Sequence, residues 1–195
     1  TNVISTLSAS QAALLSTAQM AGLSSSQLGA MTTDQLSNLG TTQIKALTSN
    51  QIKALSSAQL NNLQAAQLAV LDATSFATLS TAAVAGMTST QLGQLSTAQV
   101  AKLTSTAIAK LSTTQLQGLT TAQLAALSSS QIKSMGSAQL NALTSAQILA
   151  IDSSDIAAIN MSTLAGLTSA QLSNLSTTQV AALGTAQKAG LTSAQ

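Results

Sequence analysis

The sequence predicts an all-α solenoid built from very short helices, about two turns each, with one helix for every eight residues. Three observations predict this fold class. Large apolar residues return at two fixed positions of an eight-residue frame along the whole chain. A Ser or Thr stands three residues before a Gln in most repeats, which is the pattern of a helix-capping box. The other positions are rich in Ala, Leu and Gln, which favour helix.

The apolar frame runs through the chain without an insertion. When residue numbers are divided by eight, every residue with remainder seven, from Leu7 to Leu191, is Leu, Met or Ile. The column with remainder four begins at Ile4 and is large and apolar except at Ala12 and Lys188. We call the eight residues that begin at remainder zero an octad. The octad consensus is [ST]-[ST]-x-Q-[LIV]-A-[AGN]-L.

This spacing requires the chain to bend once in every octad. Eight residues turn an α-helix by about 800°, so the apolar stripe of one continuous helix would drift by about 80° per octad. On a strand, two positions three residues apart point to opposite faces. Neither a long helix nor a long strand therefore keeps both apolar columns on one side.

The bend is expected at the hydroxyl residue that opens each octad. In the octad STAQVAKL, Ser96 would be the N-cap and Gln99 would return to its amide, while Val100 and Leu103 share one helical face. Thr104 would then end this helix and cap the next. In TSTAIAKL, the following octad, Ala replaces the Gln, so the apolar columns appear as the primary determinant and the Gln as a local reinforcement.

Helices this short are stable only when they stack, so the apolar columns are expected to form a ladder inside a solenoid. Two octads per coil is the simplest closure, and three octads per coil is the alternative. A β-solenoid is the alternative fold class, disfavoured by the absence of Pro and the scarcity of Gly.

The domain prediction is a single continuous repeat segment over residues 1–195, expected to be a fragment of a longer chain. A longer period of 80 residues lies above the octad, with copies that begin near Asp72 and Asp152. Both Asp residues open octads that have lost the usual Gln, to Ser75 and Asp155. With two octads per coil, this super-repeat of ten octads would fill five coils.

Composition argues against an enzyme. The chain has no His, Cys, Trp, Tyr, Pro, Arg or Glu, so the usual acid/base groups and soft metal ligands are missing. We expect no catalytic residue, cofactor or small-molecule substrate. A net charge of +2 without aromatic residues other than one Phe predicts no nucleic-acid surface, and the scattered apolar residues predict no membrane insertion. The charged residues are Lys45, Lys53, Lys102, Lys110, Lys133, Lys188, Asp34, Asp72, Asp152 and Asp155.

The few polar features with functional potential have structural explanations. Asp72 and Asp152 fit helix N-caps, which is favoured over a cation site. Asp152 and Asp155 together could touch one Ca²⁺, although the six to eight oxygens that Ca²⁺ usually takes are not evident. Asn160 and Asn174 match the glycosylation sequon, a pattern common by chance in a Ser-rich chain. Lys188 in an apolar column suggests a frayed or differently packed turn.

Octads such as LTTAQLAAL, residues 119–127, and LSTAQVAKL, residues 95–103, resemble the tandem LTTAQVAAL-type repeats of very large secreted bacterial proteins. Those proteins are commonly described as adhesins or haem-utilization proteins. The resemblance covers the whole chain and implies an extracellular or cell-surface structural region. It transfers no haem ligand, because the chain has no His, Cys or Tyr.

These observations predict an extracellular structural protein that forms a stalk, sheath or self-assembling fibre. With few charges to oppose association, copies of the chain would pair end to end or laterally. The alternative is an adhesin or ice-binding surface built from rows of hydroxyl groups.

Overall fold

A computed structural model describes residues 3–191, and in these residues the chain is helical throughout with no β-strand. The prediction of an all-α fold with one short helix per octad is confirmed, and the β-solenoid alternative is wrong for the described residues. The chain divides into unit 1, Thr1–Leu103, and unit 2, Thr104–Gln195. The predicted continuous segment over 1–195 also includes residues 1–2 and 192–195, which lie outside the described residues.

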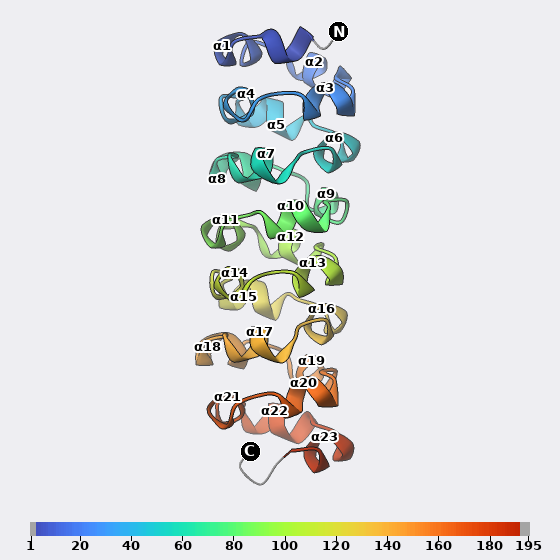
Figure 1. Ribbon diagram of the computed structural model, residues 1–195, viewed down its shortest axis with the longest axis vertical. Coiled ribbons are helices and arrows are strands. Elements are labelled where there is room, and N and C mark those ends of the chain that lie inside the picture. Colours follow the sequence, from blue (N-terminus) through green and yellow to red (C-terminus); the bar gives the residue numbers. More distant parts are fainter. Residues whose placement is uncertain (1–2, 192–195) are drawn as a thin grey trace. The chain divides into compact units, whose positions relative to one another are not determined.

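Each unit is a helical solenoid (Figure 1). Unit 1 begins with a 3₁₀ turn and continues with short α-helices: η1 (Val3–Thr6), α1 (Ala9–Ala12), α2 (Thr17–Gly22), α3 (Ser25–Gly29), α4 (Thr33–Ser37), α5 (Thr41–Lys45), α6 (Ser49–Lys53), α7 (Ser57–Asn61), α8 (Ala65–Ala69), α9 (Ala73–Phe76), α10 (Thr81–Ala85), α11 (Ser89–Gln94) and α12 (Thr97–Ala101).

Unit 2 continues the same pattern. Its helices are α13 (Ser105–Ala109), α14 (Thr113–Gln117), α15 (Thr121–Ala125), α16 (Ser129–Lys133), α17 (Ser137–Asn141), α18 (Ser145–Leu149), α19 (Ser153–Ala157), α20 (Met161–Ala165), α21 (Ser169–Ser173), α22 (Thr177–Ala182) and α23 (Thr185–Ala189).

The helices begin where the capping boxes were predicted. Ser96 lies in extended backbone (φ −67°, ψ 156°) before α12. Its amide donates to Oε1 of Gln99 at 2.8 Å, and the Gln99 amide donates to the Ser96 hydroxyl at 3.2 Å. At the other end of α12, the amide of Leu103 donates to the carbonyl of Val100 at 3.1 Å. The joint therefore needs no special residue, and no described residue has positive φ.

Both apolar columns line the core. Val100 is completely buried and Leu103 is 3% exposed, and nearly all members of the two columns from Leu28 to Leu172 are buried in the same way. Each buried Leu, Ile or Val contributes about 1.5 to 3 kcal/mol relative to an exposed side chain. Lys188 is the exception that the sequence indicated: α23 forms, but the Lys188 side chain is exposed and its Nζ donates to the carbonyl of Ala181 at 3.3 Å.

The number of octads per coil differs from the prediction of two. The strongest helix contacts join each helix to the third one along the chain, as in α1 with α4, α7 with α10, and α16 with α19. Side-chain hydrogen bonds described below join each octad to the fourth octad before it. One coil therefore holds between three and four octads.

The short joints between helices explain why a coil holds more than two octads. Two helices per coil would require the chain to reverse its direction at each joint. The joints contain only one or two residues in extended backbone, such as Leu95 and Ser96 before α12. Such short joints turn the chain by a smaller angle, so that more helices are needed to close a coil. Ten octads then fill about three coils instead of the predicted five.

Two glycines provide a test of how closely the coils approach. A Cβ atom added at Gly86, after α10, would lie 2.5 Å from the Ser57 Cβ atom of α7, whereas one added at Gly22 would meet nothing within 4 Å. We expect Gly86→Ala to lower the stability of unit 1 by about 1 to 3 kcal/mol through overpacking. Gly22→Ala, the matched control, should raise it by about 0.5 to 1 kcal/mol. Urea unfolding followed by circular dichroism checks both, and equal effects would contradict a close α7–α10 contact.

Candidate functional site: the glutamine contacts between coils

The most regular polar feature of the molecule is the glutamine at remainder three. In Gln99, Oε1 accepts from the Ser96 amide of its own octad, while Nε2 donates to the carbonyls of Leu68 and Leu71 at 2.8 and 2.9 Å. These two carbonyls lie 31 and 28 residues earlier, at the end of α8 in the preceding coil. The glutamine therefore caps its own helix and binds the coil before it with opposite ends of one amide group.

We call a remainder-three Gln a glutamine clip when its Nε2 donates to backbone carbonyls 28 to 31 residues earlier. In unit 1, clips are formed by Gln35, Gln43, Gln51, Gln59, Gln67, Gln91 and Gln99. In unit 2, they include Gln139, Gln147, Gln171, Gln179 and Gln187.

Burial makes the clips strong determinants of coil stacking. All of these Gln residues except Gln187 are buried, with exposed fractions of 1 to 8%. A buried amide must satisfy both its oxygen and its nitrogen, and each hydrogen bond contributes a net stability of about 0.5 to 1.5 kcal/mol. The interpretation of the Gln as a local reinforcement was therefore incomplete, since the same side chain also holds adjacent coils in register.

Several octads keep the Gln where the hydroxyl cap is lost. Gly40, Gly136 and Gly184 have no side chain with which to cap, but their amides still donate to Oε1 of Gln43, Gln139 and Gln187. In the first described coil the capping box is kept and the clip is absent. Its three glutamines, Gln11, Gln19 and Gln27, complete capping boxes but form no clip among the described residues.

Two pairs of neighbouring octads lack the glutamine. They contain Ser75 and Ala83 in unit 1, and Asp155 and Thr163 in unit 2. Ser75 is buried, and its hydroxyl lies 3.1 Å from that of Ser49. Asp155 is 8% exposed and accepts a hydrogen bond from the Ser129 hydroxyl at 2.5 Å. In the octads of Ser75 and Asp155, a hydrogen bond between two short side chains takes the place of the clip.

The aspartates predicted as N-caps do lie at N-cap positions. Asp152 Oδ1 accepts from both the amide, at 2.8 Å, and the hydroxyl of Ser154, and these hydrogen bonds lower the pKa of the Asp152 carboxyl. The Asp72 carboxylate accepts from the Thr74 hydroxyl but forms no capping hydrogen bond with a helix amide. The prediction of a side-chain cap is therefore wrong for Asp72.

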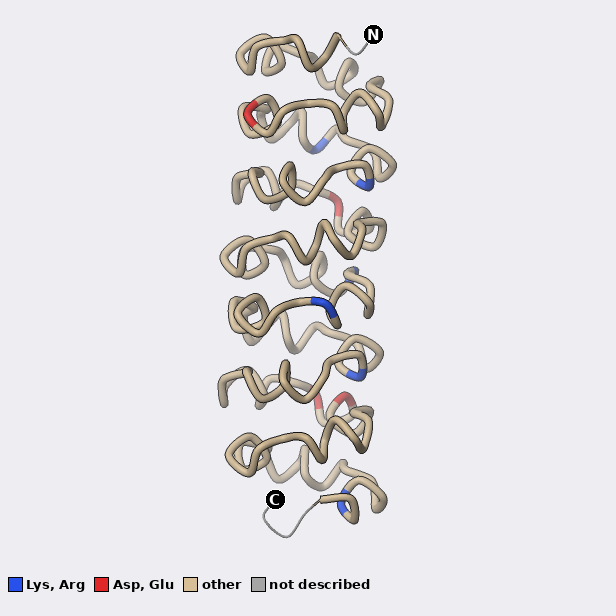
Figure 2. Tube along the Cα trace, viewed as in Figure 1, with Lys and Arg blue, Asp and Glu red and all other residues tan. Residues whose placement is uncertain are grey.

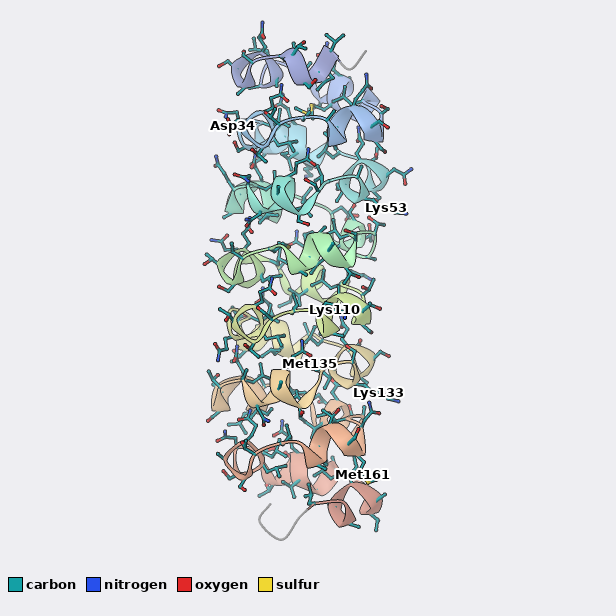
Figure 3. The ribbon with its side chains drawn as sticks, viewed as in Figure 1. Asp34, Lys53, Lys110, Lys133, Met135 and Met161 are labelled. Carbon is teal, nitrogen blue, oxygen red and sulfur yellow. The ribbon has the colours of Figure 1, made fainter. Side chains whose placement is uncertain are left out.

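The other candidate residues do not converge on one site. Within residues 3–191, no group of three or more acidic side chains is placed to hold a metal ion. Figure 2 shows the charged residues scattered along both units, and Figure 3 shows Lys53 and Lys133 pointing away from their helices. Of the two sequon residues, Asn160 is an exposed N-cap, whereas Asn174 Oδ1 accepts from the Ser145 hydroxyl at 2.9 Å. None of the described helices has the length and apolarity needed to cross a membrane.

One cavity opens in the last described coil, with a volume of about 190 Å³. Its walls are mainly apolar and come from both core columns of α21, α22 and α23. The lining residues are Ser169, Leu172, Ser173, Leu175, Val180, Leu183, Lys188 and Leu191. The Leu and Val side chains among them belong to the two apolar columns that are buried elsewhere in unit 2.

Comparison with known families agrees with the repeat architecture. The ALTTAQ repeat model matches residues 13–41, 21–57, 121–150 and 148–185. These matches cover more than half of the chain and fall in both units. Among curated proteins, no sequence matches the chain. The glutamine that forms the clips is the last residue of the motif for which the repeat is named, and the chain belongs to the ALTTAQ repeat family.

Proposed function

We propose that the chain is a structural protein of the bacterial cell surface that contributes to a stalk, sheath or self-assembling fibre, without enzymatic activity. The observation that carries the proposal is the glutamine clip. In most octads one glutamine side chain joins successive coils, and the same atoms make the same contacts from coil to coil in each unit. A contact that recurs from coil to coil lets a solenoid extend, because each coil offers to the next coil the same backbone carbonyls that the preceding coil offers to it.

The surface supports a structural role. The six Lys side chains are exposed and dispersed, and the four Asp residues do not form a charged patch with them. Little electrostatic repulsion therefore opposes association between copies. The extracellular location and the bacterial source rest on the resemblance to repeats of large secreted proteins. The proposed partners are further copies of the chain, with no nucleic acid, membrane or small-molecule substrate.

A hydroxyl surface for adhesion or ice binding is less well supported. Many hydroxyl groups are engaged in holding the protein together. Those at remainder zero cap helices, as Ser96 does, and several at remainder one join coils. Ser25 and Ser57 donate to the carbonyls of Asn50 and Ala82, three octads further on, at 3.2 and 3.0 Å. The rows are thus part of the scaffold and leave fewer free hydroxyl groups for a ligand.

Antibody labelling of intact cells that produce the protein tests the proposed location and role together. An antibody raised against the purified chain should label the outside of cells, and electron microscopy should show the label along stalks, a surface layer or fibres. Labelling only after the cells are permeabilised would overturn the proposal. A diffuse surface signal that protease removes without changing any visible structure would also contradict a structural role.

A further inference from the structure

The two sequon tripeptides of unit 2 lie in different structural settings. Asn160-Met161-Ser162 begins in the joint before α20, and Asn174-Leu175-Ser176 spans the joint between α21 and α22. Enzymes that glycosylate asparagine recognise such a tripeptide at a protein surface. Chance can place the pattern in a Ser-rich sequence, but the structure determines which of the two asparagines an enzyme can reach.

Asn160 is free to react. It is exposed, and its carboxamide forms no hydrogen bond with a described residue. This exposure belongs to the position in the octad, because every described residue at remainder zero from Ser8 to Thr168 is exposed. α20 has no capping box, since Thr163 stands in the place of the glutamine. The Asn160 side chain is therefore not held to the first turn of the helix that follows it.

The rest of this tripeptide is also open to solvent. Met161 is 52% exposed, Ser162 is exposed, and Leu164 is the residue that α20 buries. Helix α23 of the following coil contacts α20, so the exposure is present with the next coil in place. Because the tripeptide contributes no buried side chain, an enzyme can draw it away from the surface at little cost while Leu164 stays in the core.

The second tripeptide is held in place by its hydrogen bonds. Asn174 Oδ1 accepts from the hydroxyl of Ser145 in the preceding coil at 2.9 Å, and its Nδ2 donates to Oε1 of Gln171 at 3.4 Å. The Ser176 hydroxyl, which completes the tripeptide, accepts from the Gln179 amide at 3.2 Å as a helix cap. Both polar side chains of this tripeptide are therefore engaged within the protein, in contrast to those of the first.

We propose that Asn160 is a glycosylation site, modified by a transferase that uses a sugar linked through C1 to a phosphate group. Nδ2 forms a bond to C1 of the sugar, the bond between C1 and the phosphate oxygen breaks with its electron pair on that oxygen, and Nδ2 loses one proton to the transferase. No oxidant or reductant is needed. Asn160 Nδ2 takes no part in joining coils, so the sugar can be added with every clip in place. The inference rests on the proposed function, in which the sugar would face the exterior of a surface structure.

Mass spectrometry of the protein isolated from the cells that naturally produce it tests the site. Cyanogen bromide cleaves after Met135 and Met161 and so separates the two asparagines. Asn160 lies in the fragment over residues 136–161, and Asn174 lies in the fragment that begins with residue 162. The first fragment should carry the mass of at least one sugar, and the second should carry no sugar on Asn174.

Three variants produced in the same cells assign the sugar to one nitrogen atom. Asn160→Gln removes the acceptor, Ser162→Ala removes the hydroxyl that completes the tripeptide, and Asn174→Gln is the matched control. The added mass on fragment 136–161 should be lost completely in the first two variants and kept in the third. Circular dichroism verifies that all three variants fold.

A fragment 136–161 without added mass, or with added mass that persists in Asn160→Gln, would overturn the modification. Added mass on the second fragment that Asn174→Gln removes would contradict the selection of Asn160 by exposure and hydrogen bonding. Antibody labelling of the same cells decides the proposed function separately. A chain that is labelled on the outside of cells but carries no sugar on Asn160 would overturn the modification alone.

Discussion

Replacing Gln99 with Glu is expected to destabilise unit 1 by about 3 to 5 kcal/mol at neutral pH, because the variant replaces the Nε2 donor with a buried, negatively charged oxygen that faces two carbonyls. Gln99 is 1% exposed, and its Nε2 donates to Leu68 and Leu71. A carboxylate could still accept from the Ser96 amide, so the capping box alone does not predict this loss. Gln99→Ala, which removes the clip without adding charge, should cost about 1 to 3 kcal/mol.

The effect of Gln99→Glu should depend on pH with a defined sign. Burial beside carbonyl oxygens raises the pKa of the introduced carboxyl above its value in the unfolded chain. The variant is therefore least destabilised below the unfolded-state pKa, where the protonated carboxyl can donate one hydrogen bond, and it loses stability as pH rises through the folded-state pKa. Urea-unfolding midpoints at several pH values measure this, with exposed Gln94→Glu as the control. A similar cost for both variants would contradict the clip.

Truncating the single aromatic side chain should have a comparably large effect. Phe76 is 1% exposed and is the largest fully buried side chain of the described residues. We expect Phe76→Ala to lower stability by about 3 to 5 kcal/mol because it leaves a cavity in the apolar ladder. Phe76→Leu restores the residue type most common in its column and should cost no more than about 1.5 kcal/mol. Thermal and urea unfolding measure the stability of both variants. A loss of stability for Phe76→Ala no larger than that for Phe76→Leu would contradict the predicted cost of a cavity.

Local structure was predictable from sequence because its determinants lie within a single octad. The hydroxyl, the glutamine and the two apolar residues that define one helix are at most seven residues apart, as Ser96 and Leu103 show. Their spacing therefore indicates the helix, its cap and its buried face. The same argument identified the core members and the unusual position of Lys188.

The number of octads per coil could not be obtained in this way. An eight-residue period is compatible with two, three or four octads per coil, since it says nothing of the angle at each joint. The contacts that set this number span 28 to 31 residues, as between Gln99 and the carbonyls of Leu71 and Leu68. One signal was nevertheless present. A capping box accepts Glu as well as Gln, yet the chain contains no Glu, and a position that requires a donor explains this restriction.

A coil that holds a number of octads between three and four has a consequence for how such a chain can change in length. No octad is tied to one fixed side of its solenoid, and each octad that forms a clip binds the same backbone groups of the octad four places before it. Duplication or loss of a single octad in the gene would change the partners only of the octads in the next coil, and each of their clips would still meet a carbonyl pair. The length of the chain can therefore change by eight residues at a time, and the contacts between coils are kept at each length.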